Sequence, residues 1–333
     1  MQAIIPERYR QRLVRALVVS NMLPDERRPE RGRFVRDQVA ALRRLPGLEV
    51  ELYEFPPGAR NLLGAARGLR RRYRGERLDV VHAHFGLTAW PALAVAARAR
   101  GLTVHGTDVR HRRTRQVTRA VLPLMELVGA VSPELLGELP GRRARRRAQV
   151  LPCGVDLERF GPRPRSEARA ALGLDPNQAH VLFPADSARP GKRYDRALAL
   201  LRALAPERQP RLLTLGGVDP QEVPLWINAA NAVLVPSEQE GFGLAALEAL
   251  ACDVPVLATP VGVHPRALGG LAGTLCAPFA IPTWRAALEP HLSAPDPRIS
   301  GRARAEPFSS AALAIRLASA WRALLEDGDG RAG

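Results

Sequence analysis

The sequence predicts an α/β protein of two doubly wound domains, each a parallel sheet with helices on both faces. Three observations lead to this prediction. Short apolar runs alternate with helical patterns along the whole chain. The alternation forms two successive series, and a stretch rich in glycine, proline and charge separates them at 154–164. Such alternation is typical of parallel sheets covered by helices. At 333 residues, the chain is long enough for two domains.

The first predicted domain occupies residues 1–153. Its short apolar runs are those expected of buried parallel strands. We expect strands at 13–20, 49–53, 79–83, 102–105, 127–131 and 149–152. Helical periodicity predicts helices between them at 34–45, 61–73, 88–99 and 117–126.

The second predicted domain occupies residues 154–308 and repeats this pattern. We expect strands at 180–184, 211–215, 232–236, 254–258 and 274–276, and helices at 193–205, 224–230, 243–251 and 284–292. A last apolar-faced helix follows in the final segment, 309–333. Ligands of doubly wound folds bind at the carboxyl ends of the strands. Two such sheets facing each other predict a ligand site in an interdomain cleft.

Positive charge is concentrated in the first half of the chain. Residues 1–150 contain 30 arginines against 14 acidic residues, whereas residues 151–333 contain 19 basic and 19 acidic residues. Runs at 70–74, 110–115 and 142–147 carry much of the excess. We expect these runs to meet an anionic membrane surface, with solvated helix faces as the alternative reading. Few aromatic residues interleave with the runs and no nucleic-acid motif accompanies them, so no specific nucleic-acid partner is expected.

Cysteine usage and hydropathy indicate the compartment. The three cysteines are widely spaced, which favours a reducing environment over a disulfide framework. No uncharged apolar run approaches the length of a spanning helix, and the N-terminus lacks the apolar core of a signal peptide. We therefore expect a cytoplasmic protein, peripheral on the inner face of the cytoplasmic membrane.

The strongest chemical signal is EGFGLAALE at 240–248. Glycines at 241 and 243 let the backbone approach a ligand, and the N-terminus of the helix that follows offers N–H groups to an anion. Glu248, inside that helix, can accept hydrogen bonds from ribose hydroxyls. On residue types alone, an ordinary glycine-rich turn before a surface helix is an equal alternative.

The spacing and context of this motif resemble the family-4 retaining glycosyltransferases of the GT-B fold, whose two glutamates are separated by seven residues. The resemblance implies two Rossmann-like domains, the first binding the acceptor and the second the donor, with the last helix crossing back to the first. It implies that Glu240 contacts the donor sugar and Glu248 the ribose. Gly241 and the amides of Phe242, Gly243 and Leu244 would meet the sugar and phosphates.

The segment ARPGKRYD at 188–195 resembles the family's loop for the donor diphosphate. Lys192, the only lysine of the chain, falls where the family has its lysine. The family's arginine commonly lies five residues earlier, where this chain has Ser187. Arg189 is expected to substitute for it, as in members resembling teichuronic-acid biosynthesis enzymes; a solvated loop charge is the alternative.

Three segments of the first half also resemble the family: DVVHAHFG, TVHGTD and the loop that contains Gly32. His105 is expected to face the donor sugar and its leaving phosphate, and Gly32 to lie near the donor phosphate. We interpret His82 as a core histidine and expect it and His84 on opposite sides of their strand, so that they do not form a metal pair. His84 and Asp108 are expected on the acceptor side, with a helix cap as the alternative for Asp108.

These assignments predict transfer of a sugar from a nucleotide-diphosphate donor, UDP favoured over GDP, to a glycan, a lipid-linked or another hydroxyl acceptor. The resemblance implies retention of anomeric configuration. No Asp-x-Asp motif accompanies the site segments, so neither a metal nor another cofactor is expected; positive groups would stabilise the leaving phosphates. The rival predictions are a nucleotide-sugar epimerase of the same shape and a basic nucleic-acid-binding protein.

Overall fold

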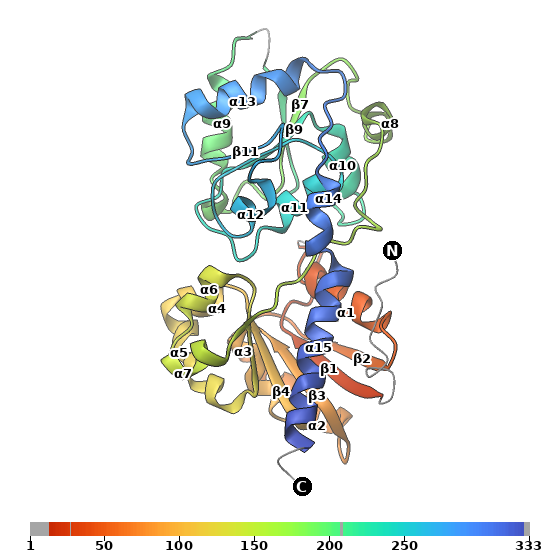
Figure 1. Cartoon of the computed structure of the whole chain (residues 1–333), viewed down its shortest axis with the longest axis vertical. Coiled ribbons are helices and arrows are strands. Elements are labelled where there is room, and N and C mark those ends of the chain that lie inside the picture. The colour runs from red at the N-terminus through yellow and green to blue at the C-terminus, as the bar shows by residue number, and fades with distance from the viewer. Residues whose placement is uncertain (1–12, 27, 207–208, 330–333) are drawn as a thin grey trace. The chain divides into compact units, whose positions relative to one another are not determined.

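The computed structural model describes residues 13–26, 28–206 and 209–329. The chain divides into two units (Figure 1). The first contains the described residues up to Asp25, Arg31–Gly154 and the residues from Ser310 onward. The second contains Glu26–Glu30 and Val155–Ser309. Each unit is built on one parallel sheet with helices packed on it, which confirms the predicted fold class.

The sheet of the first unit has the strand order β2-β1-β3-β4-β5-β6. Its strands are β1 (Val14–Ser20), β2 (Leu48–Glu54), β3 (Arg77–His84), β4 (Ala96–Val104), β5 (Leu127–Ala130) and β6 (Gln149–Val150). Its α-helices are α1 (Arg33–Arg43), α2 (Leu62–Arg72), α3 (Gly86–Ala92), α4 (Thr107–Arg110), α5 (Arg112–Val121), α6 (Pro133–Glu138), α7 (Arg142–Arg147) and α15 (Ser310–Asp329). The strand order reverses at β1, which pairs with both β2 and β3, so the carboxyl ends of these strands define the place where ligands bind in such folds.

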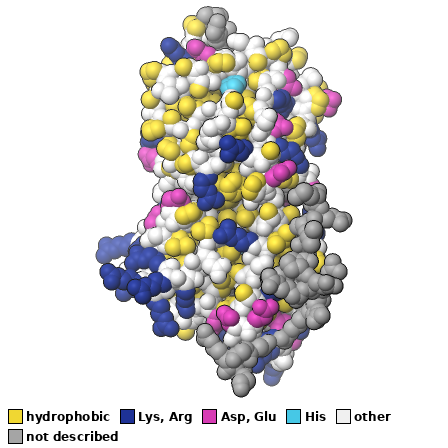
Figure 2. Space-filling view, viewed as in Figure 1, with side chains coloured by type: hydrophobic (Ala, Val, Ile, Leu, Met, Phe, Trp, Pro, Cys, Tyr) yellow, Lys and Arg dark blue, Asp and Glu magenta, His cyan; other side chains and the backbone are white. Residues whose placement is uncertain are grey.

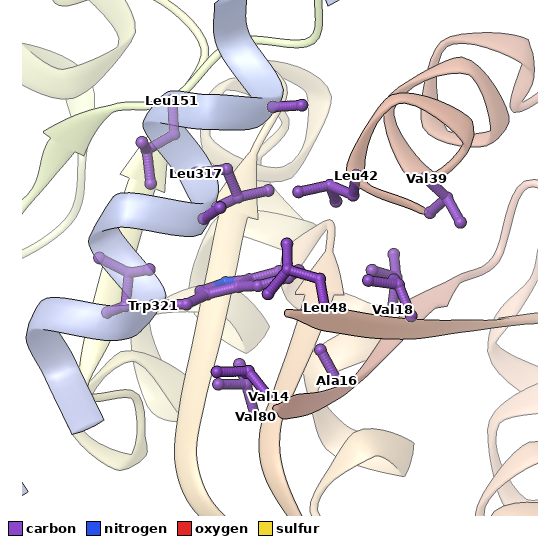
Figure 3. Close-up of a cluster of buried hydrophobic side chains, with 14 of the residues drawn as sticks. Val14, Ala16, Val18, Val39, Leu42, Leu48, Val80, Leu151, Leu317 and Trp321 are labelled. Atoms are coloured by element: carbon purple, nitrogen blue, oxygen red, sulfur yellow. The ribbon is translucent and has the colours of Figure 1, made fainter. Parts of the chain in front are cut away.

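The final helix, α15, packs on the first unit beside α1. The two helices cover one face of the sheet, and their apolar side chains meet those of β1 and β3 in one core (Figure 3). Trp321 of α15 is fully buried there, and its indole N–H donates to Nδ1 of His82 at 3.2 Å. Burial of a side chain of this size contributes ~3–5 kcal/mol, so α15 is an integral part of the first unit.

The prediction of a helix over 88–99 is wrong in its second half. Helix α3 ends at Ala92, and β4 begins at Ala96 and pairs with β3. The run of alanine and arginine has high helix propensity. However, Ala97 and Ala99 are buried while Arg98 and Arg100 are partly exposed, which is the two-residue period of a strand. Pairing with β3 therefore overrides local propensity.

The second unit has the strand order β11-β10-β9-β7-β8. Its strands are β7 (His180–Phe183), β8 (Arg211–Thr214), β9 (Ala232–Val235), β10 (Val256–Ala258) and β11 (Leu275–Cys276). Its α-helices are α8 (Arg165–Ala171), α9 (Tyr194–Arg202), α10 (Val223–Ala229), α11 (Leu244–Ala251), α12 (His264–Leu268), α13 (Ile281–Ser293) and α14 (Arg302–Ala305). Trp284 of α13 is fully buried in a core that also contains side chains of β7 and β9. The loops that follow β7 and β9 carry the two predicted donor segments.

Candidate active site

The loop between β9 and α11 approaches α12 too closely for a side chain at position 243. Gly243 precedes α11 with φ +105°, a conformation that L-residues rarely adopt. A Cβ atom there would lie 2.7 Å from Nε2 of His264. The carbonyl of Phe242 accepts a hydrogen bond from the backbone N–H of Val263 at 2.7 Å. The loop is thus fixed against the start of α12, and the first turn of α11 presents its N–H groups beside it.

Lys192 and Glu240 form an ion pair beside this loop. Nζ of Lys192 lies 2.6 Å and 2.8 Å from the two carboxylate oxygens of Glu240, and the Ser237 hydroxyl donates to Oε1 at 2.7 Å. The two charged side chains are 18% and 9% exposed. Burial raises the pKa of Glu240, but the ammonium and the hydroxyl outweigh it, so the pKa of Glu240 is lowered overall. Glu240 is therefore a carboxylate at neutral pH.

Backbone contacts hold the loops of this ion pair together. Lys192 ends a 3-10 turn, Pro190–Lys192, and the carbonyl of Gly191 accepts a hydrogen bond from the N–H of Glu238 at 3.0 Å. Arg193 adopts φ +59° and donates to the carboxylates of Asp195 and Glu238. The position of the lysine is thus fixed by the turn and not by its side chain alone.

His264 is a buried member of this site that sequence reasoning missed. Its Nδ1–H donates to the carbonyl of Thr259 at 2.8 Å, so the neutral ring carries a lone pair on Nε2. Burial lowers the pKa of His264, and the Thr259 carbonyl and Glu240 oppose that effect only in part. Among the described residues, Nε2 has no hydrogen-bond partner. A lone histidine in an apolar stretch gives no signal in the sequence; Ser237, three residues before Glu240, was also missed.

The other predicted donor residues lie on the elements next to this pair in the sequence. Glu248 lies on α11, about one turn after Leu244, and is partly buried. Arg189 directly precedes the 3-10 turn of Lys192, and its side chain is exposed. Glu240 and Lys192 are thus in direct contact beside the loop that contains Gly243, and Glu248 lies on the helix that follows this loop.

In the first unit, Gly32 occupies a position that only glycine fits. It precedes α1 with φ +71°, and a Cβ atom would lie 2.4 Å from the carbonyl oxygen of Met22. The same Cβ would lie 3.1 Å from Oε1 of Glu54, which accepts a hydrogen bond from Arg36 at 3.0 Å. The loop after β1 is therefore tightly packed where α1 begins.

Asp108 organises the loops that follow β3 and β4. Its Oδ1 accepts the backbone N–H groups of His105 at 3.0 Å and Gly106 at 2.9 Å, and its Oδ2 accepts that of Gly86 at 3.3 Å. The side chain is buried, and burial raises its pKa to about 6 despite these bonds. Asp108 lies in the first turn of α4, whose N-cap Gly106 has no side-chain cap bond, so the carboxylate ties the two loops together and does not cap that helix.

His84 and His105 form a pair at the carboxyl ends of β3 and β4. Nδ1 of His84 lies 2.8 Å from Nε2 of His105, and the two rings are tilted by 34°. The His105 ring packs against Phe85 and Phe34 at centroid distances of 4.5 Å and 5.1 Å. Burial lowers the pKa of His105 well below its ordinary value and that of His84 to about 3, so both rings are neutral at pH 7.

The expectation that His82 and His84 face opposite sides is wrong. Their ring centroids lie 5.5 Å apart, because residues two positions apart on a strand share one face. His82 is a core histidine: it bonds Trp321 and, at 2.9 Å, the hydroxyl of Thr103. In the described part of the chain, no three His, Cys, Asp or Glu side chains form a group suited to a metal ion.

Comparison with known proteins agrees with this architecture. Residues 7–159 match the family model "Glycosyltransferase Family 4", and residues 188–292 match "Glycosyl transferases group 1". A protein of Pseudarthrobacter chlorophenolicus named D-inositol 3-phosphate glycosyltransferase is 29% identical over 331 aligned residues, which cover 85% of this chain and 78% of the relative. A Gordonia bronchialis protein of the same name is 35% identical over 205, covering 49% of this chain and 44% of the relative.

Solved structures show the same fold. The sucrose-phosphate synthase of Thermosynechococcus elongatus superposes with a TM-score of 0.72 at 18% identity, covering 94% of this chain and all of that one. Anabaena HepE in complex with UDP and glucose superposes with a TM-score of 0.67 at 17% identity, covering 93% and 100%. The chain therefore has the GT-B fold. With glycosyltransferase models matched in both units, it is a glycosyltransferase.

Proposed function

We propose that this glycosyltransferase moves a sugar from a nucleotide-diphosphate sugar, UDP favoured, to a hydroxyl acceptor with retention of configuration. The observation that carries the proposal is the Lys192–Glu240 pair beside the Gly241–Gly243 loop and the N-terminus of α11. One small region there holds a cation, a carboxylate and a backbone able to approach an anion. A diphosphate and a sugar hydroxyl need this combination.

The leaving diphosphate determines the roles of the charged groups. Negative charge grows on it as the sugar departs, and fixed positive groups lower the barrier. Lys192 supplies a compact ammonium, Arg189 a second cation, and the amides of 242–244 supply hydrogen-bond donors. The Lys192–Glu240 pair must then open in part, which frees Glu240 to accept a hydrogen bond from a sugar hydroxyl. Glu248 accepts the ribose hydroxyls.

His105 acts on the sugar and its leaving phosphate in this proposal. The ring is neutral and partly exposed, so it can donate one hydrogen bond without carrying charge. Asp108 holds the backbone of His105 and supports the site without touching the acceptor. His84, like Asp108, is assigned a supporting role that acts through His105 without contact to the acceptor.

Two comparisons support the choice of substrates. HepE, a structural neighbour, was solved with UDP and glucose and with UDP-glucose, which favours UDP as the nucleotide. The relatives in sequence are named for an inositol phosphate. An acceptor that bears phosphate, free or lipid-linked within a glycan, suits the surplus of arginine in the first half of this chain.

We further propose that the first unit docks reversibly on the inner face of an anionic cytoplasmic membrane. Figure 2 shows Lys and Arg side chains gathered over the edge formed by α5 and α7. There Arg142, Arg143, Arg146 and Arg147 line an open hollow. Among the described helices, none is long and apolar enough to cross a bilayer. Each arginine near anionic lipid contributes about 1 kcal/mol, so a few suffice for reversible attachment.

A nucleotide panel tests the proposed function. The protein is mixed with UDP, GDP, ADP or dTDP in a thermal-shift assay, then incubated with the labelled sugar of the best ligand and candidate acceptors. We expect UDP to raise the melting temperature most, since a ligand that binds only the folded state stabilises it. The labelled sugar should be transferred with its anomeric configuration kept.

A matched pair of variants links that result to the site. Glu248→Gln should lose most of the UDP shift, while Glu167→Gln, at an exposed glutamate of α8, should keep it. Isomerisation of the labelled sugar without transfer would show an epimerase instead. An equal shift for all four nucleotides, or none for any, would contradict the donor assignment.

A further inference from the structure

The core under α15 becomes polar toward the carboxyl ends of its strands. On the face covered by α1 and α15, β1 presents Val14, Ala16 and Val18 and then Ser20. β3 presents Val80 and then His82 and His84, and β4 presents Ala99, then Gly101 and Thr103, with His105 next in the same alternation. Three histidines at the apolar–polar boundary of one face form a connected group, not isolated core residues.

Hydrogen bonds fix the tautomer of the first histidine in this group. The indole of Trp321 can only donate, so Nδ1 of His82 must accept. Burial lowers the pKa of His82 well below its ordinary value, so the ring is neutral and carries its proton on Nε2. That proton is donated to Thr103. His82 is therefore fully bonded.

The second histidine has one bond and one unpartnered nitrogen. His84 is fully buried, its Nδ1 meets Nε2 of His105, and its own Nε2 has no partner among the described residues. Both rings are neutral, so one donates and the other accepts. If His105 donated, His84 would carry its proton on Nε2 and bury an unsatisfied N–H. If His84 donates, only an acceptor is unused, and unused buried acceptors are less rare than orphaned N–H groups.

We propose that His84 is a positioning residue for His105: its Nδ1–H donates to Nε2 of His105 and leaves the proton of His105 on Nδ1, where it is given to an oxygen of the bound donor. This inference rests on the proposed function for the role of that proton. The tautomer itself depends only on the first unit. Asp108 fixes the backbone of His105, Phe85 and Phe34 contact the ring, and His84 determines which nitrogen carries hydrogen.

Nitrogen NMR of the whole chain tests the tautomer without any substrate. Protein labelled with ¹⁵N in its seven histidines is recorded at pH 7, and the His105 signals are assigned by their loss in His105→Gln. Two-bond ¹H–¹⁵N correlations distinguish a ring protonated on Nδ1 from one protonated on Nε2. We expect the Nδ1–H form of His105. The Nε2–H form in the wild-type protein would overturn the proposal.

Two substitutions of His84 separate positioning from packing. The Asn side-chain NH₂ occupies the place of a histidine Nδ1, so His84→Asn should keep the Nδ1–H form of His105. His84→Leu fills the volume without a donor and should give a mixture of tautomers. In transfer assays, we expect kcat to fall about 10–100-fold in His84→Leu, with donor KM within about twofold. His84→Asn should restore kcat to within about threefold.

The outcomes distinguish this inference from the proposed function. An Asn variant as impaired as the Leu variant, or a Leu variant with unchanged kcat and tautomer, would overturn the positioning role. The expected tautomers together with full transfer by His105→Gln would instead contradict the role assigned to His105. Failure of any nucleotide to bind would contradict the donor proposal, and the NMR result would still decide the tautomer.

Discussion

Nζ of Lys192 lies 2.6 Å and 2.8 Å from the two oxygens of Glu240, so the only lysine of the chain is paired with the first glutamate of the EGFGLAALE motif. The pair joins the loop after β7 to the loop after β9. The ammonium and the carboxylate, which the proposed reaction needs, neutralise each other in this ion pair. Binding of a diphosphate then competes with Glu240 for the ammonium.

Removing the ammonium should therefore cost both stability and activity. Lys192→Met leaves the Glu240 carboxylate without its cation, and we expect the free energy of unfolding at pH 7 to fall by about 1–3 kcal/mol. Transfer should fall about 30–1000-fold. Urea denaturation and a transfer assay measure the two effects, with Arg202→Met, an exposed cation of α9, as the control. Near-wild-type transfer at saturating and subsaturating donor would contradict the role of Lys192.

Acid should erase the stability difference between the wild type and Lys192→Met. The pKa of Glu240 is lowered in the folded protein, so its contribution to stability is present above the ordinary glutamate pKa of about 4.3 and is lost as pH falls through the lower folded value. The difference between the two proteins should be large at pH 7 and shrink below about pH 4. A difference that is constant with pH would show that lost packing, not the ion pair, accounts for it.

Gly243→Ala should damage the donor loop by two separable effects. The first is strain from a positive φ, about 1 kcal/mol, and the second is the collision of the new Cβ with His264. Gly173→Ala provides the matched control, because Gly173 has φ +62° with no atom within 4 Å of the added Cβ. We expect a larger loss of melting temperature at Gly243, partly restored when His264→Ala is added. Equal losses at both glycines would mean that the contact with His264 is unimportant.

His105→Ala should lower the transfer rate more than it weakens nucleotide binding. The ring lies in the first unit beside His84, whereas the ribose and phosphate ligands proposed here are in the second. Calorimetric titration with UDP and steady-state kinetics separate the two quantities. His111→Ala, at an exposed histidine six residues later, serves as the control. A large loss of UDP affinity with an unchanged rate at saturation would overturn the assignment.

Asp108→Asn should change how stability depends on pH between about 4 and 6. The pKa of Asp108 is raised to about 6 in the fold, above its ordinary value of about 3.9. The folded state therefore binds more protons across that range, and this residue's contribution to stability falls as pH rises. The wild-type melting temperature, relative to that of Asp108→Asn, should decline from pH 4 to pH 6. Parallel profiles of the two proteins would contradict the raised pKa.

The sequence predicted the parts of this molecule that follow from local pattern. Alternating strands and helices required only periodicity, and Gly243 required only backbone conformation, whereas Gly32 was suggested by the resemblance. The contact between Lys192 and Glu240 joins residues 48 positions apart. The resemblance assigned both residues to the donor, but nothing in the sequence predicted that they bond to each other. His264 and the link from Trp321 to His82 could not be found in that way, because parallel pairing and the packing of α15 bring them together. The strand at Ala96 was missed because tertiary pairing overrode helix propensity.

The arginines of α7 should decide membrane attachment. Replacing Arg142, Arg143 and Arg146 with glutamine removes three exposed charges and keeps Arg147, which donates to the carbonyl of Leu122. The wild type should sediment with vesicles that contain anionic lipid at low salt and release them as salt rises, because screening weakens exposed charges. Losing about 1 kcal/mol per arginine, the triple variant should bind about 100-fold more weakly.

A matched control replaces three exposed arginines of the second unit, Arg202, Arg211 and Arg285, with glutamine. It has the same net charge as the triple variant of α7 and should bind vesicles like the wild type. Equal weakening in both variants would show a response to net charge alone, and equal binding to neutral vesicles would contradict electrostatic docking.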